Sequence, residues 1–137
     1  MKKILGILFT MTFLTVFTAC RTTDVGSKSF IDVTWNIVEV DGSVITEFDQ
    51  QPSITFTADG QYHGNSSVNN FFGGYQHKGN TLQLSEGGVT RKMGRSMQTE
   101  MNILKALNAV ASINVEGDSA VILNASGVAV MKLRRQP

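Results

Sequence analysis

Cysteine is nearly absent from the chain, and neither sign of charge is in excess. The 137 residues contain one cysteine, Cys20, so no disulfide can form within the chain and packing alone has to hold the fold. There are 12 lysines and arginines against 11 aspartates and glutamates, a formal net charge of +1. This balance creates no strong field toward nucleic acid. We therefore expect no nucleic-acid partner.

The sequence also lacks the motifs of the common catalytic and cofactor sites. The Ser66-Ser67 pair lies in no Gly-x-Ser-x-Gly turn, and His63 and His77 lack a zinc-ligand spacing such as His-Glu-x-x-His. Gly73-Gly74 and Gly87-Gly88 lack the Gly-Lys-Ser/Thr ending of a phosphate-binding loop and are typical of bulges or turns. We expect no catalytic residue, no metal site and no cofactor.

The first 19 residues have the layout of a signal peptide. Lys2 and Lys3 supply the positive start, and an apolar run from Ile4 to Phe17 follows. A membrane-spanning helix needs roughly 20 predominantly apolar residues, so this run is too short to stay in the membrane as an anchor. We interpret residues 1–19 as a lipoprotein export signal.

The residues around Cys20 explain why we expect a lipid there. The stretch Phe17-Thr18-Ala19-Cys20 resembles the lipobox of bacterial lipoproteins, in which the cysteine receives a diacylglycerol and becomes the new N-terminus. Phe17 stands where leucine is usual, and an unmodified secretory signal is the alternative. Because each buried methylene contributes roughly 0.8 kcal/mol, two or three acyl chains would fix the protein to a membrane. The membrane is thus an expected partner.

The residues after Cys20 indicate the location and the domain organisation. No aspartate, which resembles an inner-membrane retention signal, follows Cys20 directly, and no dense acidic run follows. We therefore expect the outer membrane, on its periplasmic face.

Residues 20–29, rich in Ser, Thr and Gly, are typical of a flexible tether. The remainder is long enough for one domain, which we expect at residues 30–134 as a monomer.

Alternating apolar and polar residues predict a sheet. Trp35 and Ile37 belong to a run of period two, which places one face of a strand inward. Further strands are expected at residues 53–57, 72–77, 81–85, 112–116, 120–124 and 128–133, with Gly- and Asn-containing turns between them. The order predicts two hairpins followed by a meander.

One segment has the periodicity of a helix instead. Its apolar residues recur at three- and four-residue spacings, as in a buried stripe; they are Met97, Met101, Leu104, Leu107 and Val110. Ser96 is placed to cap the helix through its hydroxyl, and Glu100 would be favoured by the helix dipole. We predict an α+β fold with a mainly antiparallel, open barrel-like β-sheet packed on one α-helix.

A twelve-residue stretch carries a family resemblance. The segment Gly64-Asn65-Ser66-Ser67-Val68-Asn69-Asn70-Phe71-Phe72-Gly73-Gly74-Tyr75 resembles the central signature of the META domain, the HslJ-like family. The likeness covers about residues 30–134 and includes Trp35, Met93 and Glu100. It implies a small β-rich secreted or lipid-anchored domain linked to stress tolerance, without a settled molecular activity.

Two positions depart from that family signature. Val68 stands where the family has a cysteine before the asparagine, and Gly94 matches the position of its second cysteine. If those cysteines pair in relatives, this chain has lost the whole bond, and Val68 substitutes apolar packing for it.

The same stretch is our candidate binding surface. Asn69, Asn70, Phe71 and Tyr75 combine amides with aromatic rings, which can hydrogen-bond and stack on a glycan, a peptide or a lipid. The alternative is that the asparagines shape the start of a strand while Tyr75 and one of the two phenylalanines, Phe71 or Phe72, fill the core.

Three function classes stay open. A noncatalytic envelope module, stress-related and bound to an envelope protein, fits the anchor and the family best. A binder of a small apolar ligand would need a sizeable cavity under Phe71, Phe72 and Met97. An envelope-polymer hydrolase would need two carboxylates, or a serine with His63 or His77, to converge in one cleft.

Arg91, Lys92 and Arg95 form a basic cluster that fits a solvated loop, or a contact with anionic lipid or glycan.

The lipid on Cys20 can be tested directly. Mass spectrometry of the protein purified from membranes is expected to show a mature chain that starts at an acylated Cys20. An intact leader, or a mature chain that starts elsewhere and carries no fatty acid, would contradict the envelope tether.

Overall fold

The computed structural model describes residues 29–137. The expected signal peptide (residues 1–19), the lipid on Cys20 and the tether (20–29) lie outside the described residues, apart from Ser29. Within the described part, no helix is long and apolar enough to cross a bilayer.

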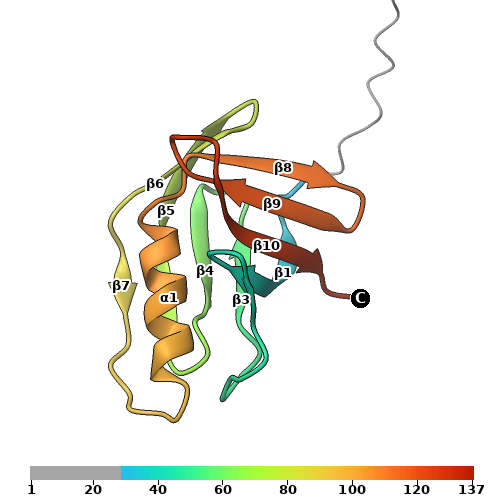
Figure 1. The fold of residues 1–137 in the computed structure, drawn as a ribbon. Helices are drawn as coiled ribbons and strands as arrows, with labels where there is room; N and C mark the ends of the chain where they lie inside the picture. The colour runs from blue at the N-terminus through green and yellow to red at the C-terminus, as the bar shows by residue number, and fades with distance from the viewer. Residues whose placement is uncertain (1–28) are drawn as a thin grey trace, which may run out of the picture.

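The described chain forms one helix and one ten-stranded sheet. Their bounds are β1 Val33–Val40, β2 Ser43–Val44, β3 Ser53–Phe56, β4 Gln61–Asn65, β5 Asn70–Lys78, β6 Thr81–Leu84, β7 Gly88–Val89, α1 Met97–Leu107, β8 Ser112–Glu116, β9 Ser119–Leu123 and β10 Ala129–Arg135. All the strand pairings are antiparallel (Figure 1).

The sheet curls into a barrel. Its strands follow the order β10-β9-β8-β6-β5-β4-β3-β1-β2, and β1 also pairs with β10. That last pairing closes the sheet further than the open form that the sequence predicts. The weakest seam lies between β6 and β8, where a single residue pair, Thr81 and Ser112, is in register. The α+β fold with an antiparallel, barrel-like sheet and one helix is confirmed.

Side chains fill the barrel. Trp35, Ile54, Phe56, Leu82 and Ile122 are fully buried, and the ring of Phe56 meets the rings of Phe30 and Tyr75 edge-on at 5.3 and 5.2 Å. Burial of each such side chain stabilises the fold by about 1.5–3 kcal/mol. The predicted strand around Trp35, both hairpins and the final meander are confirmed.

The helix forms where it is expected, but its buried face extends beyond the predicted stripe. Glu100, Ile103, Ala106 and Leu107 are the buried residues of α1, whereas Met101 is 54% exposed. Leu107 of the predicted stripe is buried, and Leu104 and Val110 pack partly buried against the core, so the prediction was wrong for the exposed Met101. The apolar periodicity could not predict the burial of Glu100. A carboxyl group is buried only where a specific partner forms a hydrogen bond or an ion pair with it.

Capping also differs from the prediction. Ser96 occupies the N-cap position but makes no side-chain cap hydrogen bond to the helix. Its hydroxyl donates instead to Asp49 Oδ1, at 3.0 Å. Asp49 also accepts from the backbone N–H groups of Arg95 and Ser96. Asp49 therefore holds the two residues just before α1, and it lies 47 positions earlier than Ser96, which no local pattern could indicate.

Candidate functional site

A groove runs between α1 and the segment 87–93, which contains β7 and is called the strap below. The groove has a volume of about 640 Å³. The strap contributes Val89, Arg91 and Lys92 to its lining, and α1 contributes Met97 and Leu104. Figure 1 shows β7 running beside α1, outside the main body of the sheet. This groove is the candidate site.

A second hollow, of about 350 Å³, adjoins the groove at the strap. Tyr62, Phe71 and Phe72 line it from the sheet, and Leu104 and Leu107 line it from α1. Gly87, Gly88, Val89 and Leu104 line both spaces. The two hollows are therefore neighbours on one surface, with the strap crossing between them.

Two glycines let the strap lie directly on the sheet. A Cβ on Gly87 would lie 1.6 Å from the carbonyl oxygen of Phe72, and one on Gly88 would lie 2.4 Å from the Phe72 ring. Real Cβ atoms essentially never come that close. Only glycine fits at position 87, where the clash is with backbone, whereas a side chain at position 88 would displace the exposed Phe72 ring. The Gly87-Gly88 pair, which the sequence suggests is a bulge or turn, is a close-approach site instead.

One buried amide holds the strap and α1 together. Asn69 is 3% exposed. Its Nδ2 donates to the Glu100 carboxyl oxygens at 2.7 and 3.0 Å and to the Lys92 carbonyl at 3.0 Å. Its Oδ1 accepts from the Thr90 hydroxyl at 2.9 Å and from the Lys92 N–H at 2.6 Å. Asn69 thus connects the start of β5, the strap and the helix.

The turn before Asn69 is built by its own side chains. The Ser66 hydroxyl donates to the Asn69 carbonyl, and Asn65 Oδ1 accepts from the Ser67 N–H. Ser67 has a φ of +96°, a conformation that costs a non-glycine residue energy. The Ser67 hydroxyl offsets part of that cost, because it accepts a hydrogen bond from the Asp49 N–H at 2.9 Å. The turn therefore joins the strand to Asp49, which holds the two residues just before α1.

The Asp49 carboxyl group has a lowered pKa. The backbone N–H of Arg95 is the main cause, followed by the Ser96 hydroxyl, because both hydrogen bonds favour the charged form. The stabilisation that these hydrogen bonds contribute is therefore present above the ordinary pKa of 3.8 and is lost as the pH falls through the lower pKa of the folded state.

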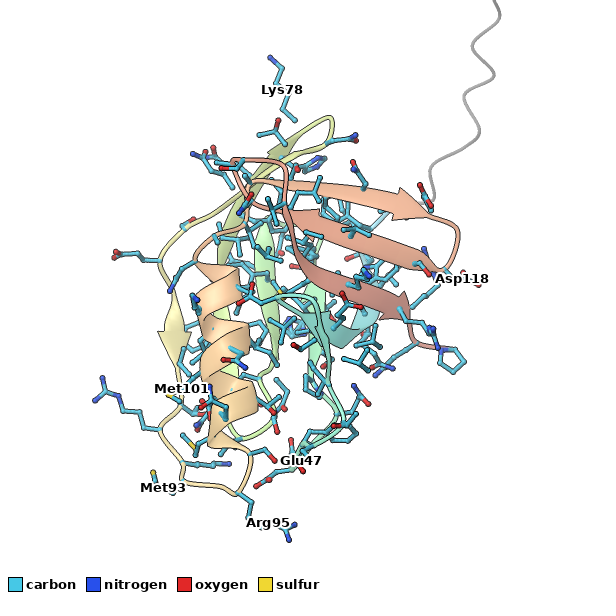
Figure 2. The ribbon with its side chains drawn as sticks, viewed as in Figure 1. Glu47, Lys78, Met93, Arg95, Met101 and Asp118 are labelled. Carbon is cyan, nitrogen blue, oxygen red and sulfur yellow. The ribbon has the colours of Figure 1, made fainter. Side chains whose placement is uncertain are left out.

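Large apolar side chains are exposed at the groove, at the adjoining hollow and on α1. Val89 is 41% exposed, Phe72 57%, Met101 54% and Met93 89%. Figure 2 shows Met93 and Arg95 at the loop that leads into α1, on the same side of the molecule as Met101. Arg91 and Lys92 add positive charge to this apolar lining.

The structure places most of the predicted binding residues in the interior. Phe71 is 2% exposed and Tyr75 is 7% exposed. The Tyr75 hydroxyl donates to the Thr57 carbonyl at 2.7 Å, and burial raises the pKa of Tyr75. Since Asn69 is buried as well, only Asn70 of the four is accessible. The proposed surface is corrected accordingly: Phe71 and Tyr75 pack in the core and Asn69 holds the strap.

The serines and histidines considered for catalysis do not converge. Ser66 and Ser67 are fully buried in the turn described above. His63 and His77 are exposed on β4 and β5, and the His77 ring meets Phe30 edge-on at 5.3 Å. Within residues 29–137, no three His, Cys, Asp or Glu side chains gather as metal ligands would.

Sequence comparison identifies the family. The profile of the META domain matches residues 28–137. The chain belongs to the META domain family. No curated protein matches it.

Solved structures share the fold of this META domain. An NMR structure of a protein from Burkholderia xenovorans is 20% identical, with a TM-score of 0.60 over 78% of this chain and 83% of that one. A crystal structure of a DUF4847 family protein from Bacteroides vulgatus is 16% identical, with a TM-score of 0.58 over 79% and 96%. A further NMR structure is 17% identical, with a TM-score of 0.60 over 74% and 87%. At these identities the likeness describes the fold alone.

The two departures from the META signature lie next to each other. A Cβ on Gly94 would lie 2.7 Å from each γ carbon of Val68 and 2.6 Å from Asp49 Oδ2. The isopropyl group of Val68 thus occupies the space beside the bare backbone of Gly94. Positions 68 and 94, which match the two family cysteines, are therefore neighbours. The Val68 side chain occupies the space between them.

This neighbourhood predicts that a disulfide can be introduced. A Cβ at position 94 would lie 2.7 Å from each γ carbon of Val68, and each γ carbon is one C–C bond from the Val68 Cβ. The Cβ atoms of residues 68 and 94 therefore lie within about 4.2 Å of each other, inside the range of disulfides. In a Cys20→Ser background, we expect Val68→Cys/Gly94→Cys to oxidise to one internal disulfide and to gain about 3 kcal/mol. Thiol titration and urea unfolding check this.

Single changes at the same place provide the control. Gly94→Ala alone would force a methyl group against Val68 and Asp49, so we expect a loss of stability of about 1–3 kcal/mol. Thiols that stay free in the oxidised double variant would show that residues 68 and 94 are not neighbours.

Proposed function

We propose that this META domain is a noncatalytic, stress-related binding module of the cell envelope. It is held by a lipid on Cys20 at the periplasmic face of the outer membrane, and it docks an envelope protein in the groove between α1 and the strap. The occupant is a peptide segment that carries apolar anchors and acidic side chains. The observation that carries the proposal is an accessible apolar groove edged by Arg91 and Lys92.

The apolar lining supplies the affinity in this proposal. Val89 lines the groove and Phe72 lines the adjoining hollow. Both keep large apolar surfaces in water, and exposed apolar surface of this kind marks interaction sites. Burial of a single apolar side chain of the partner contributes about 1.5–3 kcal/mol. Two or three such anchors contribute about 3–9 kcal/mol, which has to offset the entropic cost of association.

The basic side chains supply the choice of partner. Arg91 and Lys92 both line the groove, and Arg95 follows in the same loop. Exposed ion pairs contribute little affinity, roughly 0.2–1 kcal/mol each, but they speed the approach of an acidic segment and disfavour basic ones. The charge pattern therefore favours an acidic partner.

The start of the described chain leaves the groove free. Ser29 accepts a hydrogen bond from Arg135 of β10, and Phe30 packs against Phe56 and Tyr75 at the barrel. In Figure 1 this start lies on the side of β8, β9 and β10, away from α1 and β7. A tether that begins there allows the groove to face away from the attachment point.

A small apolar ligand is the second candidate. Both hollows, about 350 and 640 Å³, fall within the range of about 300–1,000 Å³ that is typical of ligand sites. The barrel interior is less suitable, because fully buried side chains such as Trp35, Phe56 and Leu82 occupy it. A ligand would therefore sit under the strap.

Site-specific crosslinking in living cells tests the proposal. A photoreactive phenylalanine derivative replaces Phe72, which is 57% exposed beside the strap, or Val128, which is 58% exposed at the β9–β10 turn. We expect one discrete protein adduct from position 72 and none from position 128. Arg91→Glu/Lys92→Glu should reduce the yield of that adduct severalfold while the folded state survives, because the Lys92 contacts to Asn69 are made by its backbone.

Three outcomes separate the candidates. Identical adducts from positions 72 and 128, or an adduct that is insensitive to the charge reversal, would refute docking in the groove. A lipid or another small molecule, rather than a protein, attached at position 72 would favour the second candidate.

A further inference from the structure

We propose that Met93, Met97 and Met101 form a thioether site for one soft monovalent cation, Cu(I), at the edge of the groove. This proposal goes beyond partner docking and does not depend on it. It rests on the spacing, the exposure and the chemistry of these three side chains.

Met97 is the neighbour of both other methionines. Met97 and Met101 are both in α1, and side chains four residues apart on a helix are neighbours, with Cβ atoms about 5–6 Å apart. Met93 lies in the non-helical loop before α1, and it lines the groove together with Met97. Figure 2 shows Met93 and Met101 on the same side of α1. Since a methionine side chain has three rotatable bonds, the sulfur atoms can converge on one ion.

Exposure argues against a packing role for these residues. Met93 is 89% exposed and Met101 is 54% exposed, whereas the core methionine Met131 is 1% exposed. A methionine that only fills space belongs inside, as Met131 does. Packing therefore does not account for two bare thioethers at a four-residue spacing from Met97.

The chemistry of the thioether selects the ion. Thioether sulfur is a soft, neutral ligand that suits Cu(I), whereas Mg²⁺, Ca²⁺ and Mn²⁺ prefer oxygen ligands. A thioether also has no proton to lose, so its binding does not depend on pH as thiolate or imidazole binding does. A site made of methionine alone would therefore be a Cu(I) site.

The surrounding charges favour a monovalent ion. Arg91, Lys92 and Arg95 lie in the strap or the loop that follows it, while Glu100 lies at the groove and Asp49 accepts from the N–H groups just before α1. Glu47 lies near the same end of α1, because its carbonyl accepts from the Thr99 hydroxyl. Repulsion by the three basic side chains is half as large for a monovalent ion as for a divalent one.

The test is a titration of the full chain, as purified from cells, with Cu(I) against a chromophoric Cu(I) chelator, and with Ag(I) as an air-stable substitute. We expect one ion per chain. In NMR spectra with labelled methionine methyl groups, the signals of residues 93, 97 and 101 should shift, and that of Met131 should not.

Leucine variants separate thioether binding from apolar packing, because leucine keeps the apolar volume and removes the sulfur. We expect Met97→Leu to weaken binding at least about tenfold, since even outer-shell partners of metals account for 10–100-fold, and the triple Leu variant to lose binding. Met131→Leu is the matched control and should bind as wild type. Absence of binding in the wild type, or undiminished binding in the triple variant, would overturn the proposal. The titration contains no partner protein, so its failure would leave the crosslinking result standing.

Discussion

The side-chain amide of Asn69 is the interaction on which the rest of the site depends. It lies in the interior and bonds Glu100 of α1, together with Thr90 and Lys92 of the strap. Without it, a carboxyl group with 3% exposure would lose its Asn69 donor, and buried groups without partners are costly. Because the same side chain bonds both walls, it joins strap to helix, whereas the β5–β7 pairing holds the strap to the sheet alone.

Local pattern was enough for most of the fold. Alternation around Trp35 and Ile54 predicted strands, and Gly60, Gly79 and Gly127 adopt positive φ at the expected turns. What the pattern missed depends on contacts between distant residues. The β1–β10 pairing that closes the barrel joins the two ends of the described chain. The buried face of the helix extends beyond the predicted stripe, because Glu100 is buried through a residue 31 positions away.

The candidate site was predictable only in part, for a related reason. The aromatic and amide stretch at residues 69–75 is distinctive in sequence because it is structurally demanding: Phe71 and Tyr75 pack in the core, and Asn69 organises the strap. The groove itself is lined by less conspicuous residues such as Val89, Met97 and Leu104. The family match covers this whole region. It supports the fold, while the proposed activity rests on the groove.

Hydrogen exchange in an Asn69→Ala variant tests the account most directly, with Asn70→Ala, at the exposed neighbour, as its control. If the Asn69 amide holds the site, the variant loses about 3 kcal/mol of stability. The amides of α1 and the strap then exchange faster, while those of β8, β9 and β10 keep their protection relative to global unfolding. Unchanged protection of α1, or equal effects of the two variants, would contradict the central role of Asn69.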